Sequence, residues 1–352
     1  MQAFQATKEY VKPIGRTHDL DGTRWLALSG SGIEFSFTGK KAELTIKGDQ
    51  IATGSTNQAR IGIYVNGERV VDDQLTEPLK TYTAFESDTV QDVTVTVVKL
   101  SEAAMSTVGI QEIRVDAKGE IQPTAAKARK IEIIGDSITC GYGVDDESEN
   151  NSFSTATEDV TKGYAYLTAQ ALGTDVNIVS YSGYGIISGY TTSDEKLTTQ
   201  LVPPYYEKVA YSVGKFDGTI KPETLDWDFQ AYTPDLVVIN LGTNDDSYTQ
   251  EVGERQAEYA REYVEFLKQV RARNPQAMIL CTLGIMGDRL FPFVEQAVAN
   301  YSEQTGDTRI SSMKFDVQLA SDGYGADWHP SKITQVKAAE KLTAAIKELM
   351  NW

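Results

Sequence analysis

The sequence predicts a two-domain chain in which an all-β domain precedes a three-layer α/β domain. The chain has 352 residues, more than one hydrophobic core usually organises. Short runs of alternating apolar and polar residues fill the first third, whereas apolar runs alternate with longer helical patterns in the rest. Because the composition changes near residues 123–127, we place the domains at residues 1–125 and 126–352.

The first domain shows the period-two alternation of half-buried strands. Turn signals such as Asn66-Gly67 separate the runs at intervals of about ten residues, which is typical of an antiparallel sandwich. We therefore expect a β-sandwich of the jelly-roll kind. The alternating runs lie at residues 32–37, 42–46, 61–65, 93–98 and 110–115.

The second domain alternates strands with helices. Its strand-like runs are apolar on both faces, which predicts a parallel sheet covered by helices on both sides. We expect strands at residues 131–135, 176–181, 236–241, 278–283 and 313–317, and helices near residues 163–172, 252–273, 291–305 and 331–349. In such sheets, reactive groups gather at the carboxyl ends of the strands.

Chemically suggestive segments follow four of these strands. They are Gly135-Asp136-Ser137, Ser182-Gly183-Tyr184-Gly185, Gly242-Thr243-Asn244-Asp245 and Asp327-Trp328-His329. A serine hydroxyl needs a base to take its proton, and this chain has only two histidines. We therefore expect Ser137 as nucleophile, His329 as base and Asp327 as the group that orients the imidazole.

An acyl transfer site also needs donors for the oxyanion of the tetrahedral intermediate. We assign this role to the backbone N–H groups of Ser137 and Gly183 and to the side-chain amide of Asn244. Taken singly, each residue has a structural alternative: Ser137 and Asn244 could cap helices, Gly183 could serve a turn with positive φ, and His329 could begin a helix. Their conjunction at four strand ends favours catalysis. We expect the other histidine, His18, in a solvated loop.

Composition excludes several classes of function. A formal net charge of −17 argues against nucleic acid and anionic membranes as partners, because both would be repelled. Cys140 and Cys281 imply no disulfide framework, and the wide separation of cysteines and histidines gives no zinc-ligand spacing. We therefore expect no metal and no other cofactor.

The sequence also bears on location. Residues 1–5 lack the basic and apolar regions of a signal peptide, and no segment approaches the roughly 18 apolar residues of a membrane span. We expect a cytoplasmic chain, or a secreted one if a signal peptide has been removed. Whether subunits associate is left open.

The four segments of the second domain resemble the conserved blocks of the SGNH (GDSL-type) hydrolases. This resemblance implies a flavodoxin-like sheet with strand order 2-1-3-4-5 and an oxyanion hole of Ser, Gly and Asn. The preceding β domain makes the resemblance more specific. A β-sandwich joined to such a hydrolase domain, with the segments at residues 29–35 and 327–330, looks like carbohydrate esterase family 2. That family removes O-acetyl groups from plant polysaccharides, often from a primary 6-position.

One position departs from the wider pattern. Most SGNH enzymes place the supporting aspartate three residues before the histidine, where this chain has Ala326. The resemblance therefore leaves two possibilities for orienting His329: Asp327, two residues before it, or a backbone carbonyl.

The stretch 184–234 is long for a connection and rich in aromatic residues. Aromatic rings suit the faces of pyranose sugars, so we expect Tyr184 and Trp328 to wall a subsite for an acetylated oligosaccharide. Two alternatives remain: a short-chain lipolytic or thioester hydrolase with the same machinery, and a non-catalytic carbohydrate-binding protein in which the β-sandwich is the working module.

Overall fold

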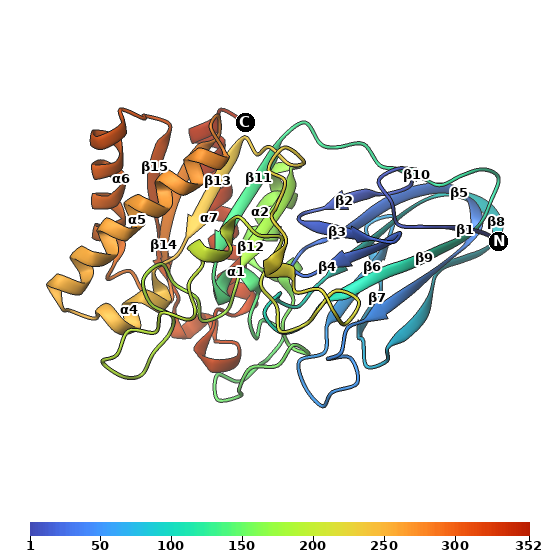
Figure 1. Ribbon diagram of the computed structural model, residues 1–352, viewed down its shortest axis with the longest axis horizontal. Helices are drawn as coiled ribbons and strands as arrows, with labels where there is room; N and C mark the ends of the chain where they lie inside the picture. The colour runs from blue at the N-terminus through green and yellow to red at the C-terminus, as the bar shows by residue number, and fades with distance from the viewer. The chain divides into compact units, whose positions relative to one another are not determined.

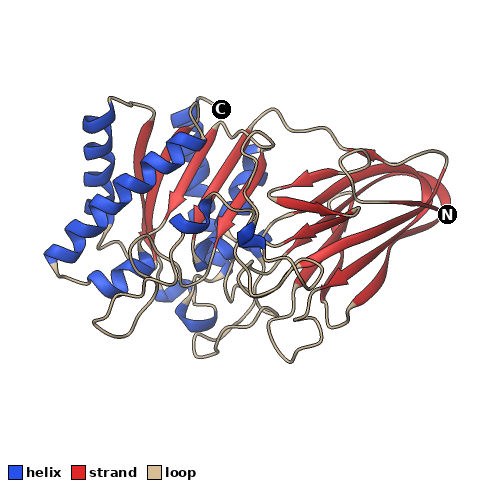
Figure 2. Cartoon of the chain, in the orientation of Figure 1, coloured by secondary structure: helices blue, strands red, loops and turns tan.

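The computed structural model describes residues 1–352, which divide into two compact units (Figure 1). Strands dominate the N-terminal part of the chain, and helices alternate with strands in the C-terminal part (Figure 2). Unit 1 contains Met1–Lys127, Ser154–Glu158 and Lys208–Trp227; unit 2 contains Ala128–Phe153, Asp159–Glu207 and Asp228–Trp352.

Unit 1 is built on an antiparallel sheet of ten strands, as the alternation predicts. The main path runs β3-β4-β9-β5-β8-β6-β7, with β1 paired to β9 and with β2 and β10 paired to β5. The jelly-roll connectivity stays a prediction. The strands are β1 Gln2–Phe4, β2 Lys12–Ile14, β3 Thr17–Leu20, β4 Thr23–Leu26, β5 Gly32–Gly48, β6 Arg60–Val65, β7 Glu68–Gln74, β8 Leu79–Lys99, β9 Val108–Ala117 and β10 Gln122–Pro123.

Two of the predicted strands are one strand in the structure. The runs 32–37 and 42–46 both belong to β5, and the buried positions change from odd to even numbers between them. The register against β9 shifts between Gly39 and Lys41, where one extra residue on β5 resets the alternation. A Cβ on Gly39 would lie 2.1 Å from the Asp116 carbonyl oxygen, so this irregularity brings two backbones close together. Period-two patterns cannot reveal such a continuation.

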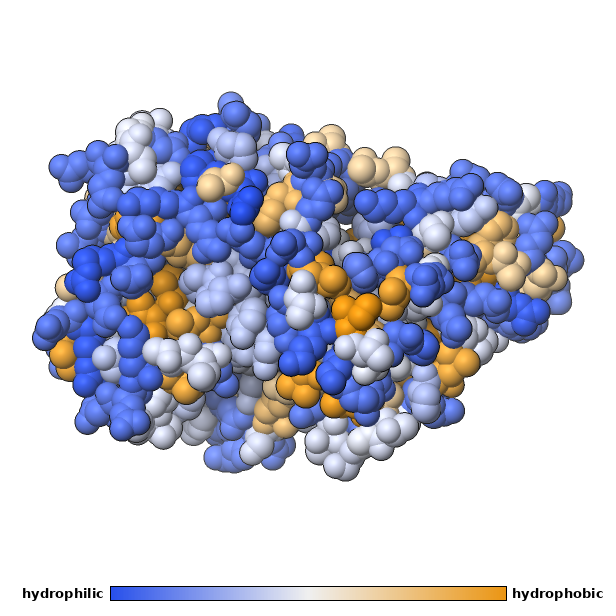
Figure 3. Space-filling model, viewed as in Figure 1, coloured by the Kyte–Doolittle hydropathy of each residue, from blue (hydrophilic) through white to orange (hydrophobic).

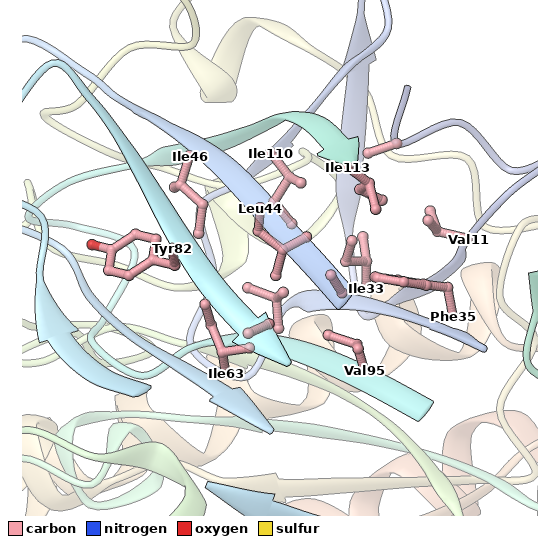
Figure 4. Packing of buried hydrophobic residues seen from close by; sticks show 14 of the residues in the cluster. Val11, Ile33, Phe35, Leu44, Ile46, Ile63, Tyr82, Val95, Ile110 and Ile113 are labelled. Atoms are coloured by element: carbon pink, nitrogen blue, oxygen red, sulfur yellow. The ribbon is translucent and has the colours of Figure 1, made fainter. Parts of the chain in front are cut away.

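The core of unit 1 comes from the inward positions of β5, β6, β8 and β9. Figure 4 shows side chains from these strands converging on one apolar interior. Members of this core with almost no exposed surface include Ile33, Phe35, Leu44, Ile63, Val95, Ile110 and Ile113.

The segment 208–227 also belongs to unit 1, although it comes from the long connection of the second predicted domain. Its Phe216 is fully buried, with its ring 5.7 Å from those of Trp25 and His18. The Arg16 guanidinium donates to the Lys208 carbonyl oxygen at 2.7 Å. The expectation that His18 lies in a solvated loop is therefore wrong: His18 is on β3 and stacks on Phe216, because this segment covers it.

The sheet of unit 2 has five parallel strands in the order β12-β11-β13-β14-β15. This confirms the predicted order 2-1-3-4-5. The strands are β11 Lys130–Gly135, β12 Asp175–Ser180, β13 Leu236–Asn240, β14 Met278–Ile285 and β15 Ile310–Val317.

Helices cover both faces of this sheet, as predicted. Helices α2 and α7 share a core cluster with one side of the strands, including Leu280. Cys281 points to the other side and meets Tyr263 of α5. The helices are α1 Ser137–Cys140, α2 Tyr164–Leu172, α3 Pro203–Tyr206, α4 Thr243–Thr249, α5 Gly253–Arg273, α6 Phe291–Thr305 and α7 Lys332–Met350, with 3-10 turns at Val160–Lys162, Pro222–Thr224, Ala320–Asp322 and Ala326–Trp328.

Hydrophilic residues cover most of the face shown in Figure 3, and apolar residues occupy small separate areas of it. This agrees with the strongly acidic composition, since the chain carries 50 acidic and 33 basic residues. No helix has the length and apolar character needed to cross a bilayer.

A buried glutamine joins the start of α7 to α2 and to α1, the helix that begins at Ser137. The Gln335 side chain accepts from the Tyr164 backbone N–H at 2.7 Å and donates to the Ile138 carbonyl at 3.1 Å. Gln335 is fully buried, and the Tyr164 N–H depends on it for a partner, whereas the Ile138 carbonyl also accepts from the Gly141 N–H. Helices α1, α2 and α7 are thus joined at one point.

We expect Gln335→Ala to lower the free energy of unfolding by about 1–3 kcal/mol, because it leaves the buried Tyr164 N–H without a partner and removes one of two donors to the Ile138 carbonyl. The exposed Glu340 on the same helix provides a control, and Glu340→Ala should change stability by less than about 0.5 kcal/mol. Chemical denaturation measures both variants. Equal stability of the Gln335 variant and the native chain would contradict this assignment.

Candidate active site

Ser137 lies at the carboxyl end of the first strand of unit 2. It is the first residue of α1, two residues after Gly135 ends β11, and it is 5% exposed. The Asp136 carboxylate caps this turn by accepting from the Ile138 N–H at 3.0 Å. The turn needs glycine at position 135, since a Cβ there would lie 2.0 Å from the Thr139 hydroxyl oxygen.

The structure brings His329 to this serine from the other end of the domain's sequence. The His329 Nε2 atom lies 2.9 Å from the Ser137 Oγ, a normal hydrogen-bond distance. Desolvation is the largest influence on the imidazole and lowers the pKa of His329 to about 4. The ring is therefore neutral near pH 7 and able to accept a proton.

The other imidazole nitrogen faces backbone oxygens. The His329 Nδ1 lies 3.1 Å from the Ala326 carbonyl oxygen and 3.2 Å from that of Asp327. The Asp327 carboxylate instead accepts a hydrogen bond from the Tyr142 hydroxyl. The sequence left two possibilities for the group that contacts the His329 Nδ1 atom. In the structure this group is a backbone carbonyl, and the Asp327 carboxylate contacts Tyr142 and not the imidazole.

Three donors face the same strand ends. Neither the Ser137 nor the Gly183 N–H has a hydrogen-bond acceptor within the chain, and Gly183 has a φ of +82°. The Asn244 Nδ2 donates to the Tyr184 carbonyl at 2.8 Å, which leaves its second hydrogen for another acceptor. All three residues follow neighbouring strands, at the edge where the nucleophile lies.

The loop that carries Gly183 is held by a buried carboxylate. Asp245 is fully buried and accepts from the backbone N–H groups of Ile186, Ile187 and Ser188 at 2.7–3.1 Å. Asn244 and Asp245 are adjacent on α4, so one short helix both supplies an amide and anchors the loop. The N-cap residue of α4 is Gly242 and no side chain caps this helix, so the alternative in which Asn244 only caps a helix is wrong.

Burial perturbs both carboxyl groups next to the nucleophile. Desolvation raises the pKa of Asp136 to about 7, with a further contribution from the nearby Asp245 charge. Desolvation also raises the pKa of Asp245 to about 6, and its backbone N–H bonds oppose this rise. The Oδ2 of Asp136 has no hydrogen-bond partner within the chain. This end of the sheet is therefore a poorly solvated environment.

Two family models match the chain, one in the N-terminal part and one in the C-terminal part. The model of the carbohydrate esterase 2 N-terminal domain matches residues 13–124. The model of the GDSL-like lipase/acylhydrolase family matches residues 133–331, more than half of the chain. The chain belongs to this hydrolase family. With its N-terminal domain, it is a member of carbohydrate esterase family 2.

Relatives of this family 2 chain include both curated and solved proteins. The cellulase/esterase CelE of Acetivibrio thermocellus is 34% identical over 64% of this chain, which spans only 26% of CelE. An acetylxylan esterase/glucomannan deacetylase of Cellvibrio japonicus is 25% identical over 99% of this chain and 91% of its own length. A family two carbohydrate esterase from Clostridium thermocellum, solved with cellohexaose, is 28% identical, with a TM-score of 0.82, and the match covers 97% of this chain and 99% of that chain.

The aromatic residues expected to wall a sugar subsite differ in exposure in this family 2 chain. Trp328 is 53% exposed and its ring lies 5.1 Å from that of Tyr324. Tyr184 is only 5% exposed, because it packs against Tyr181 and Tyr205. Trp328 thus presents a face to solvent. The Tyr184 ring is packed in the interior, and its backbone carbonyl accepts the hydrogen bond from Asn244.

Sequence reasoning missed three residues that support the family 2 site. Tyr142 contacts His329 and Asp327, Gln335 joins three helices, and Asp245 anchors the loop of Gly183. Asp245 follows Asn244 directly, so its position in a strand-end motif was a signal. Nothing local marks Tyr142 or Gln335, since their partners are distant in sequence.

Gly185 tests how tightly the anchored loop is built. A Cβ at this position would lie 2.1 Å from the Ser188 carbonyl oxygen and 2.7 Å from the Asp245 Oδ2. We expect Gly185→Ala to cost about 1–3 kcal/mol of stability and to expose residues 183–190 to limited proteolysis. Gly253 begins α5 with no atom near its Cβ position, so Gly253→Ala should be neutral or stabilising. Unchanged stability and protection in the Gly185 variant would refute the tight packing.

Proposed function

We propose that this chain is a serine esterase that removes O-acetyl groups from fragments of plant polysaccharides such as xylan or mannan. One observation carries the proposal: the 2.9 Å contact between the Ser137 hydroxyl and the neutral His329 imidazole. The names of the family 2 relatives support the class of substrate. For location we propose the cytoplasm, or the outside of the cell if a signal peptide has been removed.

Acetyl transfer uses the site in two steps. The Ser137 Oγ attacks the acetyl carbonyl carbon while His329 Nε2 takes its proton, and negative charge develops on the carbonyl oxygen. The N–H groups of Ser137 and Gly183 and the amide of Asn244 stabilise that charge. When the tetrahedral intermediate collapses, His329 returns the proton to the departing sugar oxygen, and acetyl-Ser137 remains.

Water completes the reaction in the same geometry. His329 removes a proton from a water molecule that attacks the acetyl-serine carbonyl carbon. When the second tetrahedral intermediate collapses, it releases acetic acid, which ionises to acetate, and His329 returns its proton to the departing Ser137 oxygen. No metal or organic group enters either step. In both steps His329 carries a positive charge transiently, with backbone carbonyl oxygens at its Nδ1.

Replacing the nucleophile tests the proposal directly. Ser137→Ala should lower kcat for acetate release by several orders of magnitude while leaving the thermal unfolding midpoint close to that of the native chain. The measurement is acetate release from acetylated xylo-, gluco- and manno-oligosaccharides, which also shows the preferred sugar and hydroxyl. Near-full activity of this variant would refute the assignment, and so would the absence of acetate release by the native chain.

The lowered pKa of His329 predicts the acid limb of the pH profile. Only the neutral imidazole accepts a proton from Ser137, so activity falls as pH drops through the pKa of His329 in the free enzyme. Because that pKa is lowered to about 4, kcat/KM should stay nearly constant from pH 7 to pH 5.5. An ordinary histidine would already lose much activity over this range. A midpoint at or above pH 6.5 would contradict the buried imidazole.

A further inference from the structure

Tyr142 covers one face of the imidazole. The ring centroids of Tyr142 and His329 lie 3.7 Å apart, and their planes differ by 17°, so the two rings are stacked. Phe153 contacts the same tyrosine, with ring centroids 4.8 Å apart at a tilt of 43°. The imidazole therefore has an aromatic surface, and not solvent, on this side.

The tyrosine hydroxyl reaches the turn that presents the carbonyls to His329. Asp327 and Trp328 both have left-handed backbone, with φ of 48° and 62°. Two successive non-glycine residues in this region are unusual and need support from their surroundings. The hydrogen bond from the Tyr142 hydroxyl to the Asp327 carboxylate provides such support at this turn.

The loop after α1 holds the rest of the same turn through its backbone. The Asp327 N–H donates to the Asn151 carbonyl at 2.9 Å, and the Ala326 N–H donates to the Gly143 carbonyl at 3.3 Å. The contact at Gly143 is close, since a Cβ there would lie 2.6 Å from the Ala326 side chain. The loop after α1 therefore holds the turn that precedes His329 in place.

We propose that Tyr142 is a positioning residue for His329, and that the Asp327 carboxylate acts through Tyr142 and not as the third member of a triad. The inference rests on the proposed function and explains how the base is held. Tyr142 fixes the plane of the imidazole by stacking on it. Its bond to Asp327 fixes the turn whose carbonyls orient the Nδ1–H.

The same contact helps when the imidazole becomes charged. An aromatic face attracts a cation, and a phenol that donates to a carboxylate is richer in electrons than a free one. Among the groups around the imidazole, Asp327 carries the charge that acts on the ring, and this charge favours the protonated imidazole. Loss of the tyrosine ring should therefore slow turnover by about tenfold.

The decisive comparison uses two substitutions at Asp327. In Asp327→Asn the amide oxygen still accepts from Tyr142, and asparagine tolerates left-handed backbone, so kcat should stay within about threefold of native. In a triad the same change costs about 10⁴-fold. Asp327→Ala removes the acceptor and should match Tyr142→Phe, which removes the donor.

The paired variants form a mutant cycle. If the hydroxyl and the carboxylate act together, the double variant Tyr142→Phe/Asp327→Ala should be no slower than the slower single variant. Tyr142→Leu, which also removes the stacked ring, should be slower than Tyr142→Phe, with kcat reduced and KM little changed. Tyr232→Phe is a matched control: it removes a tyrosine hydroxyl that donates to the Ile131 and Asp175 carbonyls at the opposite strand ends, and it should leave kcat unchanged.

A spectroscopic readout separates positioning from general stability. The chain has two histidines, so histidine ring signals are few and can be assigned by comparison with a His18→Gln variant. The stacked Tyr142 ring should shift the His329 ring protons upfield. This shift should persist in Tyr142→Phe and in Ser137→Ala, and disappear in Tyr142→Leu.

Three results would overturn the inference: a loss near 10⁴-fold in Asp327→Asn, multiplying losses in the double variant, or native kcat and an unchanged His329 signal in Tyr142→Leu. If Tyr142→Leu does not fold, the Phe, Asn and Ala variants still decide the question. An active Ser137→Ala variant would instead refute the proposed function, while the ring shift of His329 would remain.

Discussion

The contact between Ser137 and His329 is the constraint that the arrangement of unit 2 must satisfy for its chemistry. Ser137 follows β11 near one side of the sheet, and His329 follows β15 at the opposite edge. The chain must therefore return across the carboxyl ends of β14 and β13 before α7 begins. The sheet order makes this return possible, and the contacts of Gln335 and of the loop after α1 hold it in place.

Exclusion of water is the second condition for this chemistry. Ser137 follows the buried Asp136, whose carboxyl group feels the charge of the buried Asp245, and His329 is neutral because burial disfavours its charge. In such surroundings, hydrogen-bond donors that are fixed in advance act strongly on a developing oxyanion. The backbone satisfies the Asp245 carboxylate, so the cost of burying that charge is offset by ordering the loop that carries Gly183.

The contacts of Asp327 differ from those that its place in the sequence suggests. Asp327 lies two residues before the base, close enough to suggest a triad. The left-handed turn directs its carboxylate to Tyr142 and its carbonyl to the imidazole. Since a carbonyl dipole and an aromatic face can both stabilise a cation, a carboxylate at the Nδ1 atom is not required.

The sequence alone determined the parallel sheet, its helices, and the identity of the nucleophile, base and oxyanion donors as candidates. These follow from short-range patterns: apolar runs of strand length, helical periodicity, and reactive residues directly after strands. The comparison with family 2 relatives agrees with that assignment of the fold.

Only the tertiary structure decided which atoms meet. The stacking of Tyr142 on His329, the bridge of Gln335 and the covering of His18 by the segment 208–227 all join residues far apart in sequence. The continuation of β5 through its register shift was equally hidden, because an extra residue reverses the alternation. Periodicity reports which side of an element is buried, whereas contacts between elements depend on the path of the whole chain in space.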